Sequence, residues 1–360
     1  MATEQPRLEC SVAHRHRLEG GEMGTFDRPG AARLRDQQHP PQLATKTKPV
    51  SIALASVYTM EIVVFGAGSL GSLIGGVLAS VPSTEVTLVA RDSHVSAVCE
   101  SGLELHGELE ATTTPNATTD GRALEADLAI VTVKAFDTAG AAETLATGSY
   151  DVVLSVQNGM GNEVTLADTL ECPVLAGTAS YGAVLREPGV VECTGIGDVV
   201  LGARLGGHSE PAARIGELFA AAGLETTVAV DMPRRLWEKL AVNAGINAIT
   251  ALTETENGAV LEPPTDAIAR AAARETARVA RSCTVSLSNQ AAVASMESVA
   301  TDTAANTSSM RQDIRTERRT EIDAINGYVV DRAAQHGLEV PTNRTLTALV
   351  RTWERGVGVR

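Results

Sequence analysis

The sequence predicts an α/β domain over residues 60–230, followed by an all-helical domain over residues 231–360. In the first part, short apolar runs rich in valine alternate with helical stretches, as expected for a parallel sheet buried on both faces. A Gly-x-Gly-x-x-Gly pattern stands between the first apolar run and the first helical stretch. Beyond Asp231 the strand signals give way to long helical runs. Together these three observations indicate the fold class.

Residues 1–59 read differently from the rest of the chain. They are polar, rich in Gly, Pro and Arg, and without helix or strand periodicity, which is typical of a disordered segment. They lack a leading hydrophobic segment, so we do not expect a secretory signal. Met60 stands directly before the first strong strand pattern. Our interpretation is that translation begins at Met60 and that the preceding stretch is a disordered or non-native extension.

Apolar runs give the expected strands in order. The four clearest strands are residues 61–65, 85–90, 127–133 and 151–157. Residues 172–204 continue the β character, with turns at Pro188-Gly189 and Gly195. The expected helices of the second domain are residues 232–257, 266–287, 315–336 and 342–355.

Charge and composition exclude several kinds of partner. The formal net charge is −14; residues 1–59 hold 8 Lys+Arg against 6 Asp+Glu, so the other 301 residues hold 22 against 38. Acidity on this scale argues against a nucleic acid or an anionic membrane as partner. Combined with the scarcity of lysine, it indicates a protein adapted to a salt-rich cytoplasm.

Cysteine spacing and hydropathy bear on the compartment. The five cysteines are scattered without Cys-x-x-Cys spacing, which indicates a reducing compartment and no metal cluster. No apolar run approaches the ~20 residues that a membrane-spanning helix needs. We therefore expect a soluble cytoplasmic protein without a bound metal.

The glycine pattern of residues 66–71 predicts a dinucleotide site. Gly66 permits the tight turn, Gly68 lets a pyrophosphate approach the backbone, and Gly71 allows the helix to pack closely on the strand. The first turn of the helix then offers amide donors and the positive end of its dipole to the phosphates. The residues expected in this loop are Gly66, Ala67, Gly68, Ser69, Leu70 and Gly71.

The residue after the second strand distinguishes between the two dinucleotides. NAD-binding domains often place a carboxylate there, whereas this chain has Arg91, twenty residues past Gly71. A guanidinium can pair with a 2′-phosphate and stack on adenine. NADPH is therefore favoured, while the adjacent Asp92, which could instead be a helix cap, leaves NADH open.

Two polar residues follow later strands of the sheet. Lys134 comes just after residues 127–133, and Asn158 just after residues 151–157. Both are expected at the carboxyl ends of parallel strands, where open α/β sheets bind their ligands. Asn158-Gly159 alone would read as a plain turn, but its shared location with Lys134 and the glycine loop favours a site.

Lysine is rare enough in this chain to mark a second site. Outside residues 1–59 the only lysines are Lys134 and Lys239. A buried lysine can give up a proton near neutral pH, which arginine cannot. Asn243 and Asn247 follow Lys239 at four-residue steps, so on a helix the three side chains lie about 40° apart around the axis. The sequence predicts an acid and two amides along one stripe.

A third polar cluster precedes the last helices. Asn306, Ser308, Ser309, Asp313 and Glu321 lie before and within a helical stretch. Either serine could cap that helix, and Glu321 could lie on a solvated face. Taken one at a time, these residues are explained by helix capping or by solvent exposure, without a functional role.

Taken together, the strings "GAGSLG", "VKAFD", "QNGMG", "WEKLAVNAGINAITALTETENG" and "SSMRQDIRTERRTEIDAINGYVV" resemble the ketopantoate reductase (2-dehydropantoate 2-reductase) family. The resemblance begins at Met60, runs almost to the C-terminus and leaves residues 1–59 uncovered. It implies a Rossmann domain joined to a helical domain like that of 6-phosphogluconate dehydrogenases. It also implies NADPH-dependent reduction of 2-dehydropantoate to (R)-pantoate, a step toward pantothenate and coenzyme A.

The same resemblance assigns roles residue by residue. Lys239 is similar to the family's general acid, and Glu321 to the acidic residue near nicotinamide and substrate. Ser309 resembles the serine that contacts the substrate carboxylate. The remaining implied contacts are Asn158 with nicotinamide and substrate, Lys134 with nicotinamide, the backbone of Ala183 with cofactor, and Asn243, Asn247, Asn257 and Asn306 with substrate.

Two alternatives stay open at this level. The chain could reduce another branched 2-keto acid, because the apolar neighbours that shape the pocket cannot be placed from sequence. It could also be a catalytically silent NADP-binding regulator, against which the presence of Lys239 and Glu321 argues. The oligomeric state is not readable from the sequence, and a homodimer stays open.

Overall fold

The computed structural model describes residues 9–10 and 59–360. Strands form a nine-stranded sheet in the order β1-β6-β3-β2-β7-β8-β9-β12-β13 and a four-stranded sheet in the order β10-β11-β4-β5. The first sheet comprises β1 (Glu9–Cys10), β6 (Asn116–Thr118), β3 (Thr84–Val89), β2 (Met60–Phe65), β7 (Glu125–Val131), β8 (Ser149–Ser155), β9 (Val174–Ala179), β12 (Val199–Ala203) and β13 (Thr226–Val228). The second comprises β10 (Gly182–Glu187), β11 (Val190–Gly195), β4 (Leu103–Gly107) and β5 (Ala111–Thr113).

The larger sheet is parallel at its centre. Strands β6, β3, β2, β7, β8 and β9 run parallel to one another, and β12 then pairs antiparallel with β9. Its helices are α1 (Ser69–Ala79), α2 (Asp92–Ser101), α3 (Thr138–Leu145), α4 (Asn162–Thr169) and α5 (Glu210–Ala221). Valine-rich strands suit this sheet because both of its faces are buried: β2 sends Ile62 and Val64 into one apolar cluster and Val63 into another.

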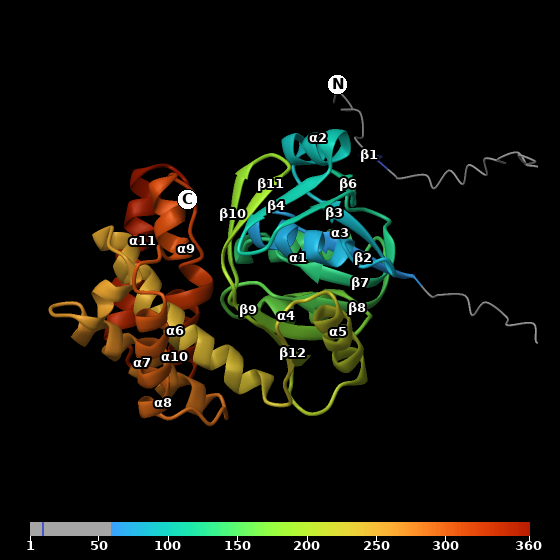
Figure 1. Ribbon diagram of the computed structural model, residues 1–360. Helices are drawn as coiled ribbons and strands as arrows, with labels where there is room; N and C mark the ends of the chain where they lie inside the picture. Colours follow the sequence, from blue (N-terminus) through green and yellow to red (C-terminus); the bar gives the residue numbers. More distant parts are fainter. Residues whose placement is uncertain (1–8, 11–58) are drawn as a thin grey trace, which may run out of the picture. The chain divides into compact units, whose positions relative to one another are not determined.

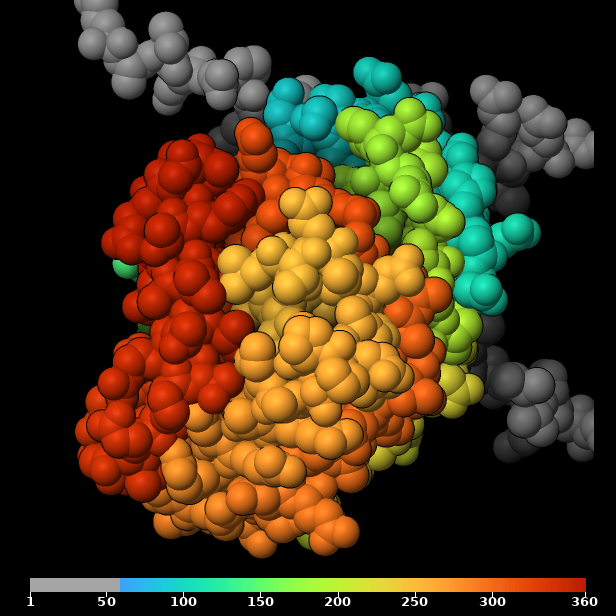
Figure 2. All heavy atoms as spheres, turned by 90° about the vertical axis from the view of Figure 1, so that its left-hand side faces the viewer, coloured from blue at the N-terminus to red at the C-terminus, as the bar shows by residue number. Residues whose placement is uncertain are grey.

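The C-terminal region is helical. Its elements are α6 (Met232–Thr253), α7 (Asp266–Ser282), α8 (Asn289–Asp302), α9 (Ser309–Arg315), α10 (Tyr328–Gln335) and α11 (Pro341–Gly356), with a 3₁₀ turn at Asn257–Leu261 and a π turn at Asp323–Gly327. In Figure 1 these helices run from yellow to red and gather around α6, and Figure 2 shows the face that α7 to α11 cover. Small residues let them pack closely: a side chain at Gly245 of α6 would begin only 2.9 Å from Met296 of α8.

The predicted fold class is confirmed: an α/β sheet domain precedes a helical region. The four clearest strand predictions correspond to β2, β3, β7 and β8, within two residues at each end. The four-stranded sheet and α8 were not expected as separate elements. The domain boundaries at residues 60, 230 and 231 stay a prediction, although α6 begins at Met232.

The helix predicted over residues 315–336 is wrong in its first part. Helix α9 ends at Arg315, and no further helical turn begins before Asp323. Glu317 has a positive φ of 47°, and the Arg318 amide donates back to the Asp313 carbonyl, so the chain turns out of the helix. This break determines how Glu321 is presented.

Within the predicted N-terminal extension, only Glu9–Cys10 and Thr59 are described. Glu9 and Cys10 form β1, which pairs antiparallel with Thr118 and Ala117 of β6 and so covers that edge of the sheet. No pattern in the sequence predicts this pairing. The rest of the predicted extension lies outside the described residues. Among the described residues, no helix is long and apolar enough to cross a membrane.

Candidate active site

The carboxyl ends of four parallel strands meet at one edge of the large sheet. Phe65 of β2 pairs with Val89 of β3 and Val131 of β7, which in turn pairs with Ser155 of β8. The chain order reverses between β2 and β7, since β3 and β6 lie on one side and β8 and β9 on the other. In open α/β sheets, ligands bind in the crevice at such a reversal.

The glycine loop lies at this reversal, and each glycine has a separate steric reason. Gly66 has a φ of +100°, and a Cβ there would lie 2.5 Å from Val133 Cγ1. A Cβ on Gly71 would lie 2.4 Å from Thr132 Oγ1. A Cβ on Gly68 would have no neighbour closer than 3.9 Å, so the space beside it is open. The backbone is therefore tightly packed at Gly66 and Gly71 and accessible at Gly68.

The start of α1 fits a dinucleotide pyrophosphate. Its N-cap is Gly68, which brings no side chain to the amides, and its first turn holds no acidic residue. Ala67 is buried beneath the loop, and Leu70 packs against the sheet core. The Ser69 hydroxyl accepts a hydrogen bond of 3.0 Å from the Leu185 amide of β10. The free helix amides and the open space at Gly68 form an anion-binding corner.

Two further residues predicted for the cofactor lie close to this corner in the fold. Arg91 is the exposed N-cap of α2, two residues after the end of β3, and makes no ion pair with any described residue. Asp92 stands in the first turn of that helix, as the capping alternative expected. Ala183 is half-buried on β10, the strand whose Leu185 amide bonds Ser69.

Lys134 joins the sheet edge to the helical region. Its ammonium donates to Asp313 Oδ2 at 2.7 Å and lies 3.6 Å from Glu321 Oε2. The other oxygen of Glu321 accepts from the Ala135 amide at 3.0 Å. Both carboxylates are buried, with exposed side-chain fractions of 4% for Asp313 and 7% for Glu321. The sequence placed Lys134 and Glu321 at the site separately, but it gave Asp313 no role.

Burial and neighbouring charges shift the pKa values of Lys134, Asp313 and Glu321 in opposite directions. Burial raises the pKa of Glu321 above its ordinary value and outweighs the stabilising charge of Lys134. Burial likewise raises the pKa of Asp313. For Lys134, burial acts to lower the pKa, but the charges of Glu321 and Asp313 outweigh it and the pKa is raised. The lysine is held as an ammonium between two carboxyl groups.

A buried hydrogen-bond network ties together the loops that carry Lys134 and Asn158. Gln157 Nε2 donates to the Val133 carbonyl at 2.9 Å and to Thr138 Oγ1 at 2.8 Å. Thr138 donates to Asn162 Oδ1 at 2.9 Å, and Asn162 Nδ2 donates to the Asn158 carbonyl at 3.0 Å. These bonds use the backbone of Asn158 and leave its side-chain amide without a partner among the described residues.

Lys239 projects from α6 toward the end of β9. Its ammonium donates to the Ala179 carbonyl at 2.8 Å. Burial lowers its pKa to about 8, against the opposing influence of the carboxylates of Asp198, Glu321 and Glu163. Lys239 was predicted to lie near Glu321. The two side chains form no ion pair, but the charge of Glu321 acts on the pKa of Lys239. Lys239 is thus a half-buried cation that can release a proton near neutral pH.

Glu163 is a residue that sequence reasoning missed. It lies in the first turn of α4, is 4% exposed, and its Oε1 has no hydrogen-bond partner. Burial raises its pKa to about 7, opposed in part by Ser155, Arg204 and Lys239. It follows the predicted Asn158 by five residues, but a glutamate at the start of a helix ordinarily reads as a favourable exposed charge.

The predicted substrate residues divide into two groups. The side chains of Asn243, Asn247 and Ser309 make no hydrogen bond to any described residue, although Asn247 is only 6% exposed. Ser308, not Ser309, caps α9 by accepting from the Arg311 amide, and it also bonds Thr250 at 2.8 Å. Ser309 therefore keeps its hydroxyl for a ligand.

Asn257 and Asn306 form the second group. The Asn257 amide donates to the Asn306 carbonyl at 3.0 Å, so the structure brings these two residues together. Asn257 Nδ2 donates to Thr303 Oγ1 at 3.0 Å, while its buried Oδ1 has no partner. The side chain of Asn306 is exposed.

Comparison with known proteins points in one direction. Residues 62–206 match the family model described as ketopantoate reductase PanE/ApbA, and residues 231–354 match its C-terminal counterpart. The chain is 43% identical over 303 residues to a 2-dehydropantoate 2-reductase of Halobacterium salinarum, covering 82% of this chain and 99% of that protein. It is 37% identical to one of Pyrococcus horikoshii, covering 82% and 98%.

Solved structures agree with these relatives. A PanE/ApbA family ketopantoate reductase from Ralstonia eutropha superposes with a TM-score of 0.76 at 33% identity, over 83% of this chain and all of that one. A D-mandelate dehydrogenase, solved with NADH and anilino(oxo)acetate, superposes with a TM-score of 0.78 at 25% identity, over 84% and 100%.

Proposed function

The chain belongs to the ketopantoate reductase family, and we propose that it reduces 2-dehydropantoate (ketopantoate) to (R)-pantoate with NADPH. The observation that carries this proposal is Lys239, a half-buried lysine whose pKa of about 8 makes it a proton donor near neutral pH. It shares α6 with Asn243 and Asn247, whose amides have no protein partner among the described residues. An ammonium beside two free amides suits a site that binds a ketone and protonates its oxygen.

Reduction of a ketone builds negative charge on the carbonyl oxygen. Lys239 Nζ stabilises that charge and then donates a proton to the oxygen. Its carbonyl partner, Ala179, is uncharged and keeps the ammonium in place without removing its proton. The nearby carboxylates of Asp198, Glu321 and Glu163 favour the charged form of Lys239 before the reaction.

The glycine loop and the neighbouring strand ends would hold the cofactor. A nicotinamide dinucleotide, when bound, supplies the hydride. The start of α1 would hold its pyrophosphate because Gly68 leaves the helix amides accessible. Arg91, exposed and without an ion pair among the described residues, would pair with a 2′-phosphate, which is why we propose NADPH over NADH.

The substrate would lie between the sheet edge and α6. Asn243, Asn247 and Asn158 offer free amides to its hydroxyl and keto groups. Ser309 offers a free hydroxyl to its carboxylate. Glu321 is fixed by Lys134 and the Ala135 amide, so it orients the loop after β7 at the cofactor side of the same space.

A second candidate is a reductase of another 2-keto acid. It is favoured by the likeness to the D-mandelate dehydrogenase, whose aromatic ligand differs from ketopantoate in shape. The deciding experiment measures NADPH and NADH oxidation with ketopantoate and with aliphatic and aromatic 2-keto acids, at low and multimolar salt. The highest kcat/KM with ketopantoate and NADPH is expected. A higher kcat/KM with an aromatic 2-keto acid would favour the second candidate, and no turnover with any of them would favour a silent NADP-binding regulator.

A further inference from the structure

A cavity of about 450 Å³ lies in the helical region, between the end of α6 and the segment that leads into α9. One wall comes from residues 254–259 and the other from Ala304 and Arg311. Backbone hydrogen bonds join the walls at one end, where the Gly258 amide donates to the Ala304 carbonyl at 3.0 Å. None of the lining residues belongs to the site proposed above, but Glu256 and Gly258 flank Asn257 in sequence.

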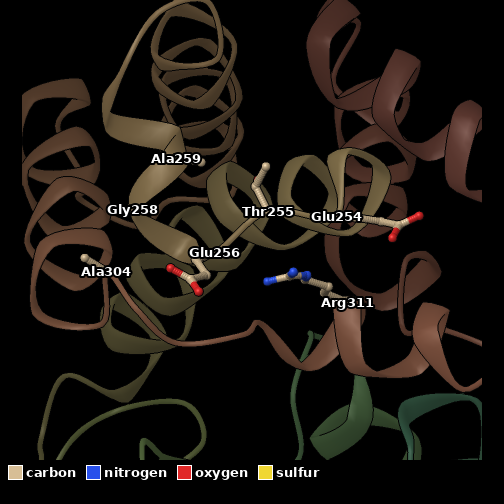
Figure 3. Close-up of a pocket in the computed structure, with 7 residues that line it drawn as sticks. All are labelled: Glu254, Thr255, Glu256, Gly258, Ala259, Ala304 and Arg311. Carbon is tan, nitrogen blue, oxygen red and sulfur yellow. The ribbon is translucent and has the colours of Figure 1, made fainter.

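Arg311 is the unusual residue of this pocket. It is 6% exposed, and its Nε has no hydrogen-bond partner. Its only hydrogen bond from the guanidinium to a described residue is a long one of 3.5 Å, from Nη1 to Thr307 Oγ1. Figure 3 shows the guanidinium pointing into the pocket toward Glu256. An arginine buried to this degree is ordinarily paired with an anion.

The two glutamates of the pocket do not fill that role. The carboxylate of Glu256 faces the guanidinium across the pocket, and that of Glu254 points away from it (Figure 3). Neither comes within 4.0 Å of Arg311, since no ion pair joins them to it. Both glutamates are exposed, so water can solvate them where they stand. The buried cation is left with space in front of it.

We propose that this pocket binds a small carboxylate, whose two oxygens pair with the guanidinium of Arg311. A planar guanidinium matches a carboxylate with two parallel hydrogen bonds. The facing carboxylate of Glu256 selects against a phosphate, because it would repel a dianion more strongly than a monoanion. Thr255 lines the same space and adds a hydroxyl.

The carboxylate has two potential sources. One is the keto acid itself, because the pocket adjoins Asn257 and Asn306, two amides assigned to substrate. That source rests on the proposed function. The other is a separate small carboxylate that occupies the pocket beside the substrate, and this source does not depend on turnover.

The test is calorimetric titration of the full chain with acetate, with its uncharged counterpart acetamide, and with phosphate, at constant ionic strength. Acetate is expected to bind, and Arg311→Leu to weaken it about ten- to a hundred-fold, the range for a charge-assisted hydrogen bond. The matched control is Arg315→Leu, which removes an exposed arginine from the same helix. Arg311→Lys should retain part of the affinity, since it keeps the charge but not the planar fork.

Equal acetate affinity in wild type and Arg311→Leu would overturn the proposal, as would tighter binding of phosphate or equal binding of acetamide. If Arg311→Leu does not fold, Glu256→Gln provides a second test: it should tighten acetate several-fold by removing a facing negative charge, and an unchanged affinity would count against the pocket. A tenfold or larger rise in the ketopantoate KM of Arg311→Leu would show that the carboxylate in the pocket is that of the substrate itself. An unchanged KM with lost acetate binding identifies a separate ligand. Absence of ketopantoate turnover in the wild type would overturn the proposed function alone.

Discussion

The ammonium of Lys134 lies 2.7 Å from Asp313 Oδ2, across a sequence separation of 179 residues. This contact joins the loop after β7 to α9 and places Glu321 beside the same ammonium at 3.6 Å. The carboxylate of Asp313 is buried, whereas the lysine side chain is 39% exposed. The pair therefore lies at the edge of a buried region, where one member is fixed and the other can reach a ligand.

Asp313→Asn is expected to lower the free energy of unfolding by about 1.5–3 kcal/mol, because it removes a charge-assisted hydrogen bond to a buried group. The control is Glu339→Gln, which breaks an exposed ion pair with Arg344 and should cost no more than about 1 kcal/mol. Denaturant unfolding of both variants measures the difference. Equal losses would mean that the Lys134 contact contributes no more than a surface ion pair.

Lys239→Ala should lower turnover by roughly 10²–10⁴-fold while cofactor binding is retained, as for loss of a positioned acid. Lys239→Arg restores the charge without a transferable proton, so most of the loss should remain. Since the acid must be protonated and its pKa is about 8, wild-type turnover should hold below pH 8 and fall above it. Near-normal turnover of Lys239→Arg would assign the proton to another residue or to water.

Glu163→Gln should move this alkaline fall to lower pH. The pKa of Glu163 is about 7, so near pH 8 it is largely ionised and favours the ammonium of Lys239. Removing that charge should lower the midpoint of the alkaline fall in turnover by roughly half a pH unit to one pH unit. The matched control is Asp168→Asn, an exposed carboxylate on the same helix. A midpoint that moves equally in both variants, or in neither, would contradict a specific effect of Glu163.

The same variant predicts a change in stability. The pKa of Glu163 is raised on folding, so its contribution to stability is present below pH 4.5 and is lost as pH rises toward 7. Glu163→Gln cannot ionise and should abolish this loss. Unfolding measured between pH 4 and 8 should therefore show a flatter profile for the variant than for the wild type.

Arg91→Ala should weaken NADPH use by roughly ten- to a hundred-fold and leave NADH use nearly unchanged, as expected for loss of one charge-assisted phosphate contact. The ratio of kcat/KM for the two cofactors measures this directly. Equal losses with both cofactors would make Arg91 structural, and a strong wild-type preference for NADH would overturn the NADPH proposal.

A chain that begins at Met60 is expected to fold and to keep its turnover. Strand β1 would be lost, but it contributes only two residues at the edge of the sheet, and β6 remains paired with β3. Thermal unfolding and kcat of the shortened and full chains provide the comparison. A large loss of either would show that residues before Met60 support the fold.

Features that depend on neighbours along the chain can be predicted from the amino-acid sequence alone. The glycine spacing, the strand before it and the helix after it specify the loop at residues 66–71, because turn geometry and helix packing are local. The four-residue spacing of Lys239, Asn243 and Asn247 likewise places them along one stripe of α6 as soon as the helix forms. The resemblance to the family's motifs adds Glu321 and Ser309 to the predicted site.

Contacts between groups far apart in the chain become known only from the folded structure. Nothing in the residues around Lys134 indicates that Asp313 is its partner, and nothing around Glu163 indicates that it is buried. The turn at Glu317 interrupts the predicted helix and is held by the hydrogen bond from the Arg318 amide to the Asp313 carbonyl. The sequence pattern did not predict this turn. Hydrophobic periodicity reports which face of an element is buried, but a charge pairing across 179 residues depends on how the loop after β7 and α9 pack against each other.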